Sequence, residues 1–223
     1  MGDKVLENRE QIERENFYRA TLDAYQDAAT ARKYADTLSQ HRDEFLHDYI
    51  FDFCESLPRG GRILDLGCGT GIDVGHLRSS GYQAFGIDVS EEMVKIATDR
   101  FGPYFQVFDA RKLGCVDWPP FDAVMSIAQV LHIHPSDIEE FFYNVKDRLK
   151  KGGKLLVGTK CGKAFAWDKR LGISKPRANA FYDRAKMVAL FESSGFYIED
   201  ILERTVLRRD RKEKWILIVG ISE

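Results

Sequence analysis

From residue 62 onward, short apolar runs alternate with longer segments in which apolar residues recur at helical spacing. The runs predict five strands, at about 62–66, 83–88, 104–108, 121–127 and 153–159. The segments between and after them predict helices at about 72–80, 90–101, 136–149 and 183–194. Strands that alternate with helices are typical of a parallel sheet covered on both faces, so the pattern predicts an α/β fold.

Two further apolar runs, at about 196–205 and 214–221, end the chain. Only a charged segment from Arg208 to Glu213 separates them. A loop of that length is too short for the helical crossover that parallel neighbours require. The last two strands are therefore predicted to be antiparallel.

The first 58 residues have a helical character. Residues 3–35 contain little Gly or Pro and many good helix formers, and Phe45, Tyr49 and Phe53 form one stripe within a second predicted helix at 40–56. Pro58 and the two glycines after Arg59 end this helix. We expect a helical cap or lid over residues 1–58 and a core domain over residues 59–223.

The composition is that of a soluble globular protein, with 44% hydrophobic and 30% charged residues. A length of 223 residues is sufficient for one sizeable α/β core. No apolar run approaches the length needed to cross a bilayer, and the charged N-terminus lacks the apolar core of a secretory signal. The four cysteines have no paired spacing. We therefore expect a cytoplasmic protein without a membrane partner.

Charge is distributed unevenly along the chain. Residues 1–145 are net acidic and residues 146–223 net basic, although the whole chain has a net charge of only −2. This asymmetry fits a surface for an anionic partner, and it fits equally two solvated faces that fold against each other. The sequence leaves both interpretations open.

The first predicted strand leads into a turn with alternate glycines, Gly67-Cys68-Gly69-Thr70-Gly71. Glycine has no Cβ, so the backbone can bend tightly and lie against a ligand. The helix that follows points its free amide groups at the same place. Asp88 ends the next predicted strand, where a carboxylate accepts hydrogen bonds from ribose hydroxyls. Together these features predict a site for a nucleoside-containing cofactor.

The glycine spacing distinguishes between cofactors. Dinucleotide-binding turns follow G-x-G-x-x-G, whereas this turn reads G-x-G-x-G with Asp65 before it. With Asp88, Asp109 and the segment 149–153 following in register, the chain resembles the class I S-adenosylmethionine-dependent methyltransferases over about residues 59–160. The resemblance implies a seven-stranded, mostly parallel Rossmann-like sheet of order 3-2-1-4-5-7-6 with the last strand antiparallel. It also implies S-adenosylmethionine as cofactor and S-adenosylhomocysteine as product.

The resemblance places the methionine half of the cofactor at the glycine turn. Asp65, Gly67 and Gly69 match the positions whose carboxylate and backbone lie against the aminocarboxylate. Cys68 is expected beside the ligand as a small space-filling side chain rather than as a nucleophile, because only the helix terminus would lower its thiol pKa. Gly71 belongs to the same motif, or it serves only as the entry to the helix.

The adenosine half is implied to lie at the neighbouring strands. Asp88 matches the acid that binds the ribose hydroxyls, and Val89 is expected to pack on the adenine. Asp109 matches the acid that accepts from the adenine amino group, with Ala110 beside it. Ala128 begins the segment after the fourth strand, where the wall of the active site is expected.

His132 lies in this segment and is expected to be a wall residue or a general base. His132 and His134 can also face the same side as metal ligands, but only Asp137 accompanies them at ligand spacing, so we expect no metal. Tyr18 and Tyr25 resemble the Y-x-x-x-A-x-x-Y element that caps the cofactor in small-molecule members of the family, with Leu22 where alanine is usual. Core packing is the alternative for both tyrosines.

The segment after the fifth strand is expected to line the acceptor pocket. It mixes basic and aromatic residues: Lys160, Lys163, Phe165, Trp167, Lys169, Arg170, Lys175, Arg177, Phe181 and Tyr182. These fit an anionic or aromatic small molecule, an RNA backbone with a stacked base, or a plain exposed loop.

The function expected from the sequence is methyl transfer to a small-molecule acceptor. The basic final third favours an RNA- or tRNA-modifying methyltransferase as the first alternative, but no appended RNA-binding domain is visible, so a nucleic-acid partner is not expected. The second alternative is a protein that binds S-adenosylmethionine without turnover. A nicotinamide-dependent oxidoreductase is disfavoured by the glycine spacing.

Overall fold

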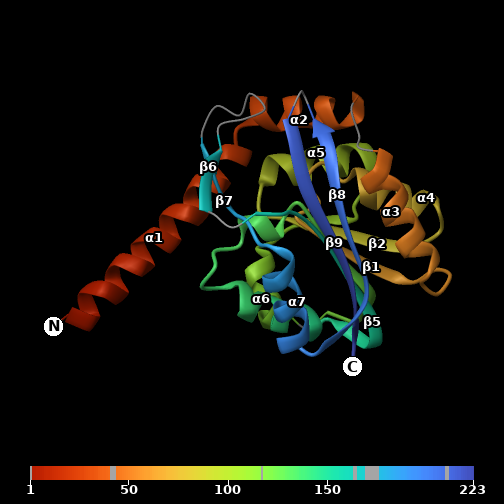
Figure 1. The fold of residues 1–223 in the computed structure, drawn as a ribbon. Coiled ribbons are helices and arrows are strands. Elements are labelled where there is room, and N and C mark those ends of the chain that lie inside the picture. Colours follow the sequence, from red (N-terminus) through yellow and green to blue (C-terminus); the bar gives the residue numbers. More distant parts are fainter. Residues whose placement is uncertain (1, 41–43, 117, 163–164, 169–175, 209–210) are drawn as a thin grey trace.

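A computed structural model describes residues 2–40, 44–116, 118–162, 165–168, 176–208 and 211–223 (Figure 1). The strands of its main sheet are β1 Arg62–Leu66, β2 Gln83–Asp88, β3 Phe105–Val107, β4 Phe121–Ile127, β5 Leu149–Lys160, β8 Phe196–Arg208 and β9 Arg211–Ser222. The α-helices are α1 Gly2–Tyr25, α2 Ala28–Gln40, α3 Glu44–Glu55, α4 Ile72–Ser79, α5 Glu91–Phe101, α6 Ile138–Lys146 and α7 Arg184–Ser193. Two short 3₁₀ helices are η1 Ala110–Cys115 and η2 Val130–His132.

The seven strands are ordered β3-β2-β1-β4-β5-β9-β8. β1 pairs in parallel with β2 and β4, and the parallel pairing continues outward to β3 on one side and β5 on the other. β9 lies antiparallel between β5 and β8. Counted within this sheet, the order is 3-2-1-4-5-7-6 with the last strand antiparallel, which confirms the predicted fold.

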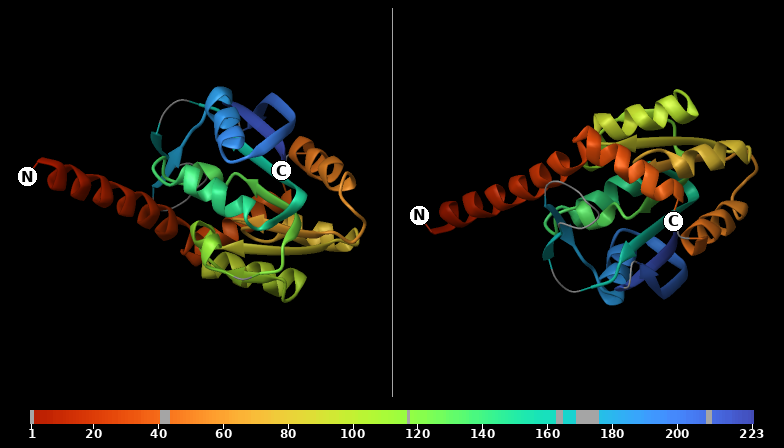
Figure 2. Two further views of the ribbon diagram at one scale, coloured as in Figure 1. Left: turned by 90° about the horizontal axis from the view of Figure 1, so that it is seen from below. Right: turned by 90° about the horizontal axis from the view of Figure 1, so that it is seen from above.

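Alternate residues of the central strands face two apolar layers. Leu64 and Val124 belong to a buried cluster with residues of α6 and α7, whereas Ile63 and Met125 belong to a second cluster with residues of α3 and α4. The helices therefore cover both faces of the sheet (Figure 2). α3, which falls within the predicted cap, packs on the sheet as part of the second layer.

The N-terminal region differs from the single helix expected over residues 3–35. It forms α1 and α2, with the break near Asp27, whose carboxylate accepts a hydrogen bond of 2.8 Å from the backbone N–H of Thr30. A carboxylate in this position caps a new helix and thereby separates it from the previous one. α1 is long, and its first turns extend away from the body of the protein (Figures 1 and 2).

A second small sheet was not predicted. β6 Phe165–Asp168 and β7 Arg177–Ala180 pair antiparallel and are separate from the main sheet. β7 lies beside η2 and beside α1. This places Arg177 and Ala178 next to the segment that follows β4.

Candidate functional site

A cavity of about 290 Å³ lies at the carboxyl ends of β1, β2 and β4, beneath α1 and α2. The predicted site residues that line it are Tyr18, Tyr25, Gly67, Gly69, Asp88, Val89, Asp109, Ala110, Ala128 and His132. They come from five separate segments, so the fold brings the predicted positions together at one edge of the sheet, where ligands bind in open α/β sheets. The predicted residues Asp65, Cys68 and Gly71 are not among its lining residues.

The glycine turn forms the floor of the cavity. Gly67 and Gly69 have φ angles of +70° and +52°, which favour glycine. A Cβ on Gly67 would lie 2.5 Å from Cγ of Gln129, whereas a Cβ on Gly69 would meet only Cε1 of Tyr34, at 3.9 Å. Gly69 therefore leaves an open position over which a ligand can approach the backbone.

Three motif residues, Asp65, Cys68 and Gly71, lie outside the cavity. The carboxylate of Asp65 is buried within β1. Burial raises the pKa of the Cys68 thiol well above its ordinary value, assisted by the negative charges of Asp88 and Asp65, so Cys68 is a poor nucleophile. Gly71 starts α4 with a φ of +75°, and a Cβ there would lie 2.6 Å from the ring of Phe105. Close packing of the helix entry thus accounts for Gly71.

Asp88 connects the two loops at the floor of the cavity. Its carboxylate accepts one hydrogen bond from the N–H of Gly69 (3.0 Å) and one from the N–H of Ser90 (2.9 Å). Burial raises the pKa of Asp88, and these backbone donors partly oppose the shift. Each oxygen keeps a further lone pair for another donor.

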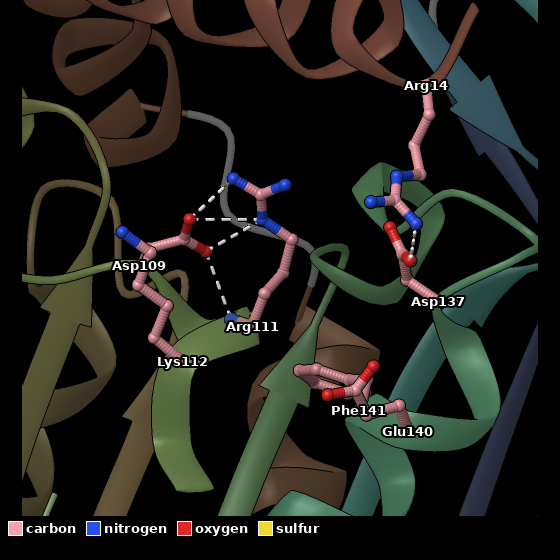
Figure 3. Close-up of a pocket in the computed structure, with 7 residues that line it drawn as sticks. All are labelled: Arg14, Asp109, Arg111, Lys112, Asp137, Glu140 and Phe141. Carbon is pink, nitrogen blue, oxygen red and sulfur yellow. Dashed lines mark hydrogen bonds and ion pairs between the residues drawn. The ribbon is translucent and has the colours of Figure 1, made fainter. Parts of the chain in front are cut away.

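Asp109 is held by Arg111 at the opposite end of the cavity. The guanidinium approaches the carboxylate with a shortest N–O distance of 2.5 Å, and its central carbon lies 3.6 Å from the ring centre of Tyr18. Arg111 and Asp109 also line a smaller neighbouring pocket of about 200 Å³, together with Arg14, Lys112, Asp137, Glu140 and Phe141 (Figure 3). The ion pair therefore separates the two cavities.

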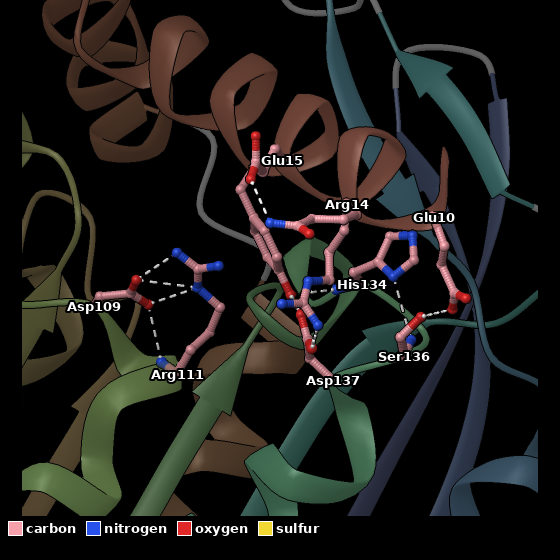
Figure 4. Close-up of polar contacts among 10 residues, drawn as sticks. Glu10, Arg14, Glu15, Asp109, Arg111, His134, Ser136 and Asp137 are labelled. Carbon is pink, nitrogen blue, oxygen red and sulfur yellow. Dashed lines mark hydrogen bonds and ion pairs between the residues drawn. The ribbon is translucent and has the colours of Figure 1, made fainter. Parts of the chain in front are cut away.

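α1 is fixed over the cavity by hydrogen bonds to the turn before α6. The hydroxyl of Tyr18 donates to Asp137 at 2.5 Å and accepts from the N–H of His134 at 3.0 Å. Arg14 pairs with the other oxygen of Asp137 at 3.0 Å (Figure 4). Burial and the Asp137 contact raise the pKa of the Tyr18 phenol, so it remains a donor at neutral pH.

Tyr25 and His132 meet on the wall of the cavity. Nδ1 of His132 lies 3.1 Å from the carbonyl oxygen of Ala178, which can only accept, so Nδ1 carries the proton and Nε2 is a base. Nε2 lies 3.3 Å from the hydroxyl of Tyr25. That hydroxyl accepts a hydrogen bond from Arg177 and so directs its own proton at Nε2. Burial raises the pKa of Tyr25.

The end of β4 has an unusual backbone. Ala128 has a φ of +57°, uncommon for a residue with a side chain, and its N–H donates to the carbonyl of Gly158 at 2.7 Å. The next residue, Gln129, accepts a hydrogen bond from the hydroxyl of Ser126 at 2.8 Å, and its side chain lies over Gly67. Such outliers are concentrated at ligand sites.

The structure adds lining residues that the sequence did not indicate, including Tyr34, Arg111, Phe108 and Met93, and it adds Gln129 from the predicted wall segment. Tyr34 arrives from α2, and its ring lies 6.1 Å from that of Tyr25. Its approach depends on how α2 folds back over the site, for which the sequence has no local signal. Arg111 did have a local signal, since it follows Asp109 by two residues in the sequence.

The predicted acceptor segment is only partly described. Lys163, Lys169, Arg170 and Lys175 lie outside the described residues, as does the side chain of Phe165. The remaining predicted residues differ in position: Trp167 is 54% exposed, Lys160 pairs with Glu213 at 2.8 Å, Phe181 is partly exposed and the Tyr182 hydroxyl donates to the buried carbonyl of Ile133. Arg177 and Tyr182 contact residues that line the cavity, through the hydroxyl of Tyr25 and the carbonyl of Ile133 respectively.

Two features are absent from the described part of the chain. Within it, no cluster of three or more His, Cys, Asp or Glu side chains has the geometry of a metal site. None of the described helices is both long enough and apolar enough to cross a bilayer.

The fold and the cavity define an α/β domain that binds its ligand at the carboxyl edge of a Rossmann-like sheet. Residues 63–153 match a family model described as a methyltransferase domain. The chain is 38% identical over 107 residues to a putative methyltransferase, YqeM, of Bacillus subtilis, which covers 45% of this chain and 43% of that protein. It is 26% identical over 160 residues to a magnesium-protoporphyrin O-methyltransferase of Rhodobacter capsulatus, covering 65% of this chain and 71% of the relative.

A similar fold occurs in the crystal structure of the magnesium protoporphyrin IX methyltransferase of Synechocystis, which contains bound SAM. The two chains superpose with a TM-score of 0.61 at 17% identity, over 96% of each chain. Residues 63–153 thus match a methyltransferase domain, and the chain is similar over that region to proteins named as methyltransferases. The chain spans less than half of the length of the Bacillus subtilis relative.

Proposed function

We propose that this protein transfers a methyl group from S-adenosylmethionine to a small-molecule acceptor and releases S-adenosylhomocysteine. The observation that supports this most strongly is the single cavity that joins Gly69 and Asp88 to the base His132. A nucleoside-binding floor and a proton acceptor on the same cavity are what a transfer reaction to a protonated nucleophile requires.

The residues of the cavity fit the cofactor. The open position at Gly69 suits the methionine end, and the lone pairs of Asp88 suit two ribose hydroxyls. Val89, Met93 and Phe108 offer apolar surface for the base. When bound, S-adenosylmethionine supplies an electrophilic methyl group on a positively charged sulfur.

The chain's own residues then have three tasks. The acceptor's proton passes to the hydroxyl of Tyr25 as Tyr25 gives its own proton to Nε2 of His132, the nitrogen that the contact with the carbonyl of Ala178 leaves unprotonated. Tyr25, held by Arg177, keeps the imidazole oriented. Tyr18 and Tyr25 hold α1 over the cavity, which excludes water and fixes the reactants in line.

A small acceptor is favoured over RNA by the roof of the site. α1 and α2 both contribute lining residues, so the cavity lies beneath the helical cap rather than on an open basic surface. Two similar proteins are named for magnesium-protoporphyrin, a small molecule. An acceptor with anionic or aromatic groups remains our hypothesis, and so does the cytoplasmic location, which rests on the sequence.

Calorimetric titration with S-adenosylmethionine, S-adenosylhomocysteine and NAD tests the cofactor. We expect binding of the first two and none of NAD; binding of NAD alone would indicate an oxidoreductase instead. Mass spectrometry of small-molecule extracts incubated with the protein and labelled cofactor tests turnover. Tight binding without any labelled product would favour the non-catalytic alternative, and a titration with bulk tRNA across a salt series tests the RNA alternative.

A further inference from the structure

Three consecutive backbone N–H groups of the glycine turn are already used within the protein. Those of Gly67 and Cys68 both donate to the carbonyl of Ile87, at 2.8 and 2.9 Å. That of Gly69 donates to the carboxylate of Asp88 at 3.0 Å. The methionine end of the cofactor carries an α-carboxylate, and both of its oxygens accept hydrogen bonds. A donor for this carboxylate must therefore come from elsewhere in the cavity.

The side chain of Gln129 lies directly on the first glycine of the turn. A Cβ on Gly67 would come within 2.5 Å of Cγ and 2.8 Å of Cβ of Gln129. Gln129 lines the same cavity as Gly67 and Gly69. Its terminal amide is thus at the end of the cavity where the methionine half of the cofactor is expected.

Ser126 determines which branch of this amide faces the cavity. Its hydroxyl, fully buried in β4, donates to Oε1 of Gln129 at 2.8 Å. Nε2, on the other branch of the planar amide, donates to none of the described residues. It is also not one of the buried polar atoms that lack a partner in that part of the chain, so it keeps accessible surface. Because Gln129 lines the cavity, the N–H groups of Nε2 are available to a ligand there.

We propose that Nε2 of Gln129 donates to the α-carboxylate of the cofactor, and that Ser126 is the positioning residue that holds the amide in this orientation. This inference rests on the proposed function. An N–H donor suits a carboxylate and not the neighbouring α-ammonium, whereas a reversed amide would present Oε1 and suit the ammonium. A hydrogen bond to an ionised acceptor is also stronger than one between neutral groups. The segment after β4 thus recognises the methionine end through a side chain.

The test compares S-adenosylhomocysteine with its decarboxylated analogue S-adenosyl-3-thiopropylamine, which keeps the ammonium. Calorimetry measures both dissociation constants for the unaltered protein, Gln129→Met and Gln129→Glu. Methionine preserves the unbranched stem that packs on Gly67. Loss of the amide should weaken binding of S-adenosylhomocysteine roughly 10–100-fold, as expected for a hydrogen bond to a charged group, and leave binding of the analogue within about threefold. Gln129→Glu places a second negative charge beside the carboxylate, so it should weaken S-adenosylhomocysteine further and bind the analogue at least as tightly as the unaltered protein does.

Gln83→Glu is the matched control for the added charge. Gln83 begins β2, at the opposite end of the strand from Asp88, and its Nε2 donates to the carbonyl of Gly60 at 3.1 Å. This substitution should change neither dissociation constant. Ser126→Ala, which releases the amide, should weaken S-adenosylhomocysteine alone, and by less than Gln129→Met does. Circular dichroism and melting curves verify that each variant folds.

The outcomes separate this inference from the proposed function. Unchanged binding of S-adenosylhomocysteine by Gln129→Met, or an equal loss for both ligands, overturns the inference. Tighter binding of S-adenosylhomocysteine by Gln129→Glu also overturns it, because Oε1 would then face the ammonium. If Gln129→Met fails to fold, Gln129→Glu, which has nearly the same shape as the native side chain, decides by the sign of its effect. No binding of S-adenosylhomocysteine by the unaltered protein would overturn the proposed function as well.

Discussion

Gly67 and Gly69 share a left-handed backbone conformation but differ in what a side chain would meet. At Gly67 a Cβ would collide with Gln129, and at Gly69 it would enter the cavity. The first glycine is thus required for packing of the protein and the second for access of the ligand. The turn motif combines a structural and a functional requirement two residues apart.

Substitution of each glycine by alanine should separate these requirements. Both variants carry the cost of a left-handed alanine, roughly 1–2 kcal/mol, and Gly67→Ala adds a steric clash. We expect Gly67→Ala to lower the melting temperature further than Gly69→Ala, while Gly69→Ala retains its fold and loses affinity for S-adenosylhomocysteine. Gly152→Ala, with a φ of +74° and no atom within 4 Å of the added Cβ, measures the backbone cost alone. Equal melting temperatures and unchanged affinity for S-adenosylhomocysteine in all three variants would contradict the separate roles of Gly67 and Gly69.

Asp88 gives the site a pH dependence with a defined sign. Burial raises its pKa above the ordinary 3.8, and only the ionised form accepts hydrogen bonds at both oxygens. Affinity for S-adenosylhomocysteine should therefore fall as the pH decreases towards that raised pKa. Asp88→Ala should weaken binding by about 1–3 kcal/mol and remove this part of the pH dependence. Titration calorimetry at several pH values checks both; an unchanged affinity in the variant would exclude Asp88 from the site.

His132 is expected to act on turnover rather than on cofactor binding. His132→Gln keeps a polar side chain but cannot accept a proton, so kcat should fall by roughly 10²–10⁴-fold, the usual contribution of a general base. The dissociation constant of S-adenosylhomocysteine serves as the control and should stay the same. Normal turnover by the variant would show that the acceptor needs no base.

At the scale of elements, α1 is attached to the core at two points on opposite sides of the cavity. Tyr18 contacts Asp137 and His134, and Tyr25 contacts His132, while the carbonyl of Tyr25 accepts a hydrogen bond of 2.7 Å from Ser90. The helix thus roofs the site through these polar contacts together with the buried side chain of Phe17. Its opening and closing should depend on them.

Tyr18→Phe tests this attachment, because it removes the hydroxyl and preserves the ring beside Arg111. We expect faster hydrogen exchange in α1 and a loss of about 1–3 kcal/mol in the free energy that holds the helix closed. Tyr197→Phe, at a tyrosine 64% exposed on β8, is the matched control and should leave exchange in α1 unaltered. Unchanged protection of α1 in Tyr18→Phe would rule out this contact as its anchor.

The sequence predicted the central strands well because their signal is local. The bounds of β1, β2 and β4 agree with the predicted ranges, since each is an apolar run bounded by turn residues. The small sheet of β6 and β7 was missed because its pairing joins residues 165–168 to 177–180, and the sequence between them has no hairpin signal. The break between α1 and α2 was missed although Asp27 is a recognisable N-cap.

The residues of the site show the same difference between local signals, which the sequence reveals, and long-range packing, which it does not. Gly67, Gly69 and Asp88 belong to one strand-turn-strand motif and were predicted as a group. Tyr34 reaches the cavity only through the packing of α2, which no local pattern encodes. The ion pair of Arg111 with Asp109 joins residues two apart in the sequence, so it had a local signal although it was not predicted.

For the whole molecule, the cavity is bounded by parts that are distant in sequence: the glycine turn, the ends of β2 and β4, and the two N-terminal helices. A ligand that contacts all of them should stabilise the entire fold. At a hundredfold excess over its dissociation constant, S-adenosylhomocysteine should add about 2.7 kcal/mol to the free energy of unfolding. For a chain of this size the melting temperature should rise by roughly 5–10 °C. Scanning calorimetry with Asp88→Ala as control checks this, and an equal shift in that variant would count against binding at Asp88.

The most direct test of the account is a crystal structure of the protein with S-adenosylhomocysteine. We predict the ligand in the cavity between the glycine turn and α1, with both ribose hydroxyls within hydrogen-bonding distance of the Asp88 carboxylate. A ligand bound elsewhere, or a ribose without contact to Asp88, would contradict it.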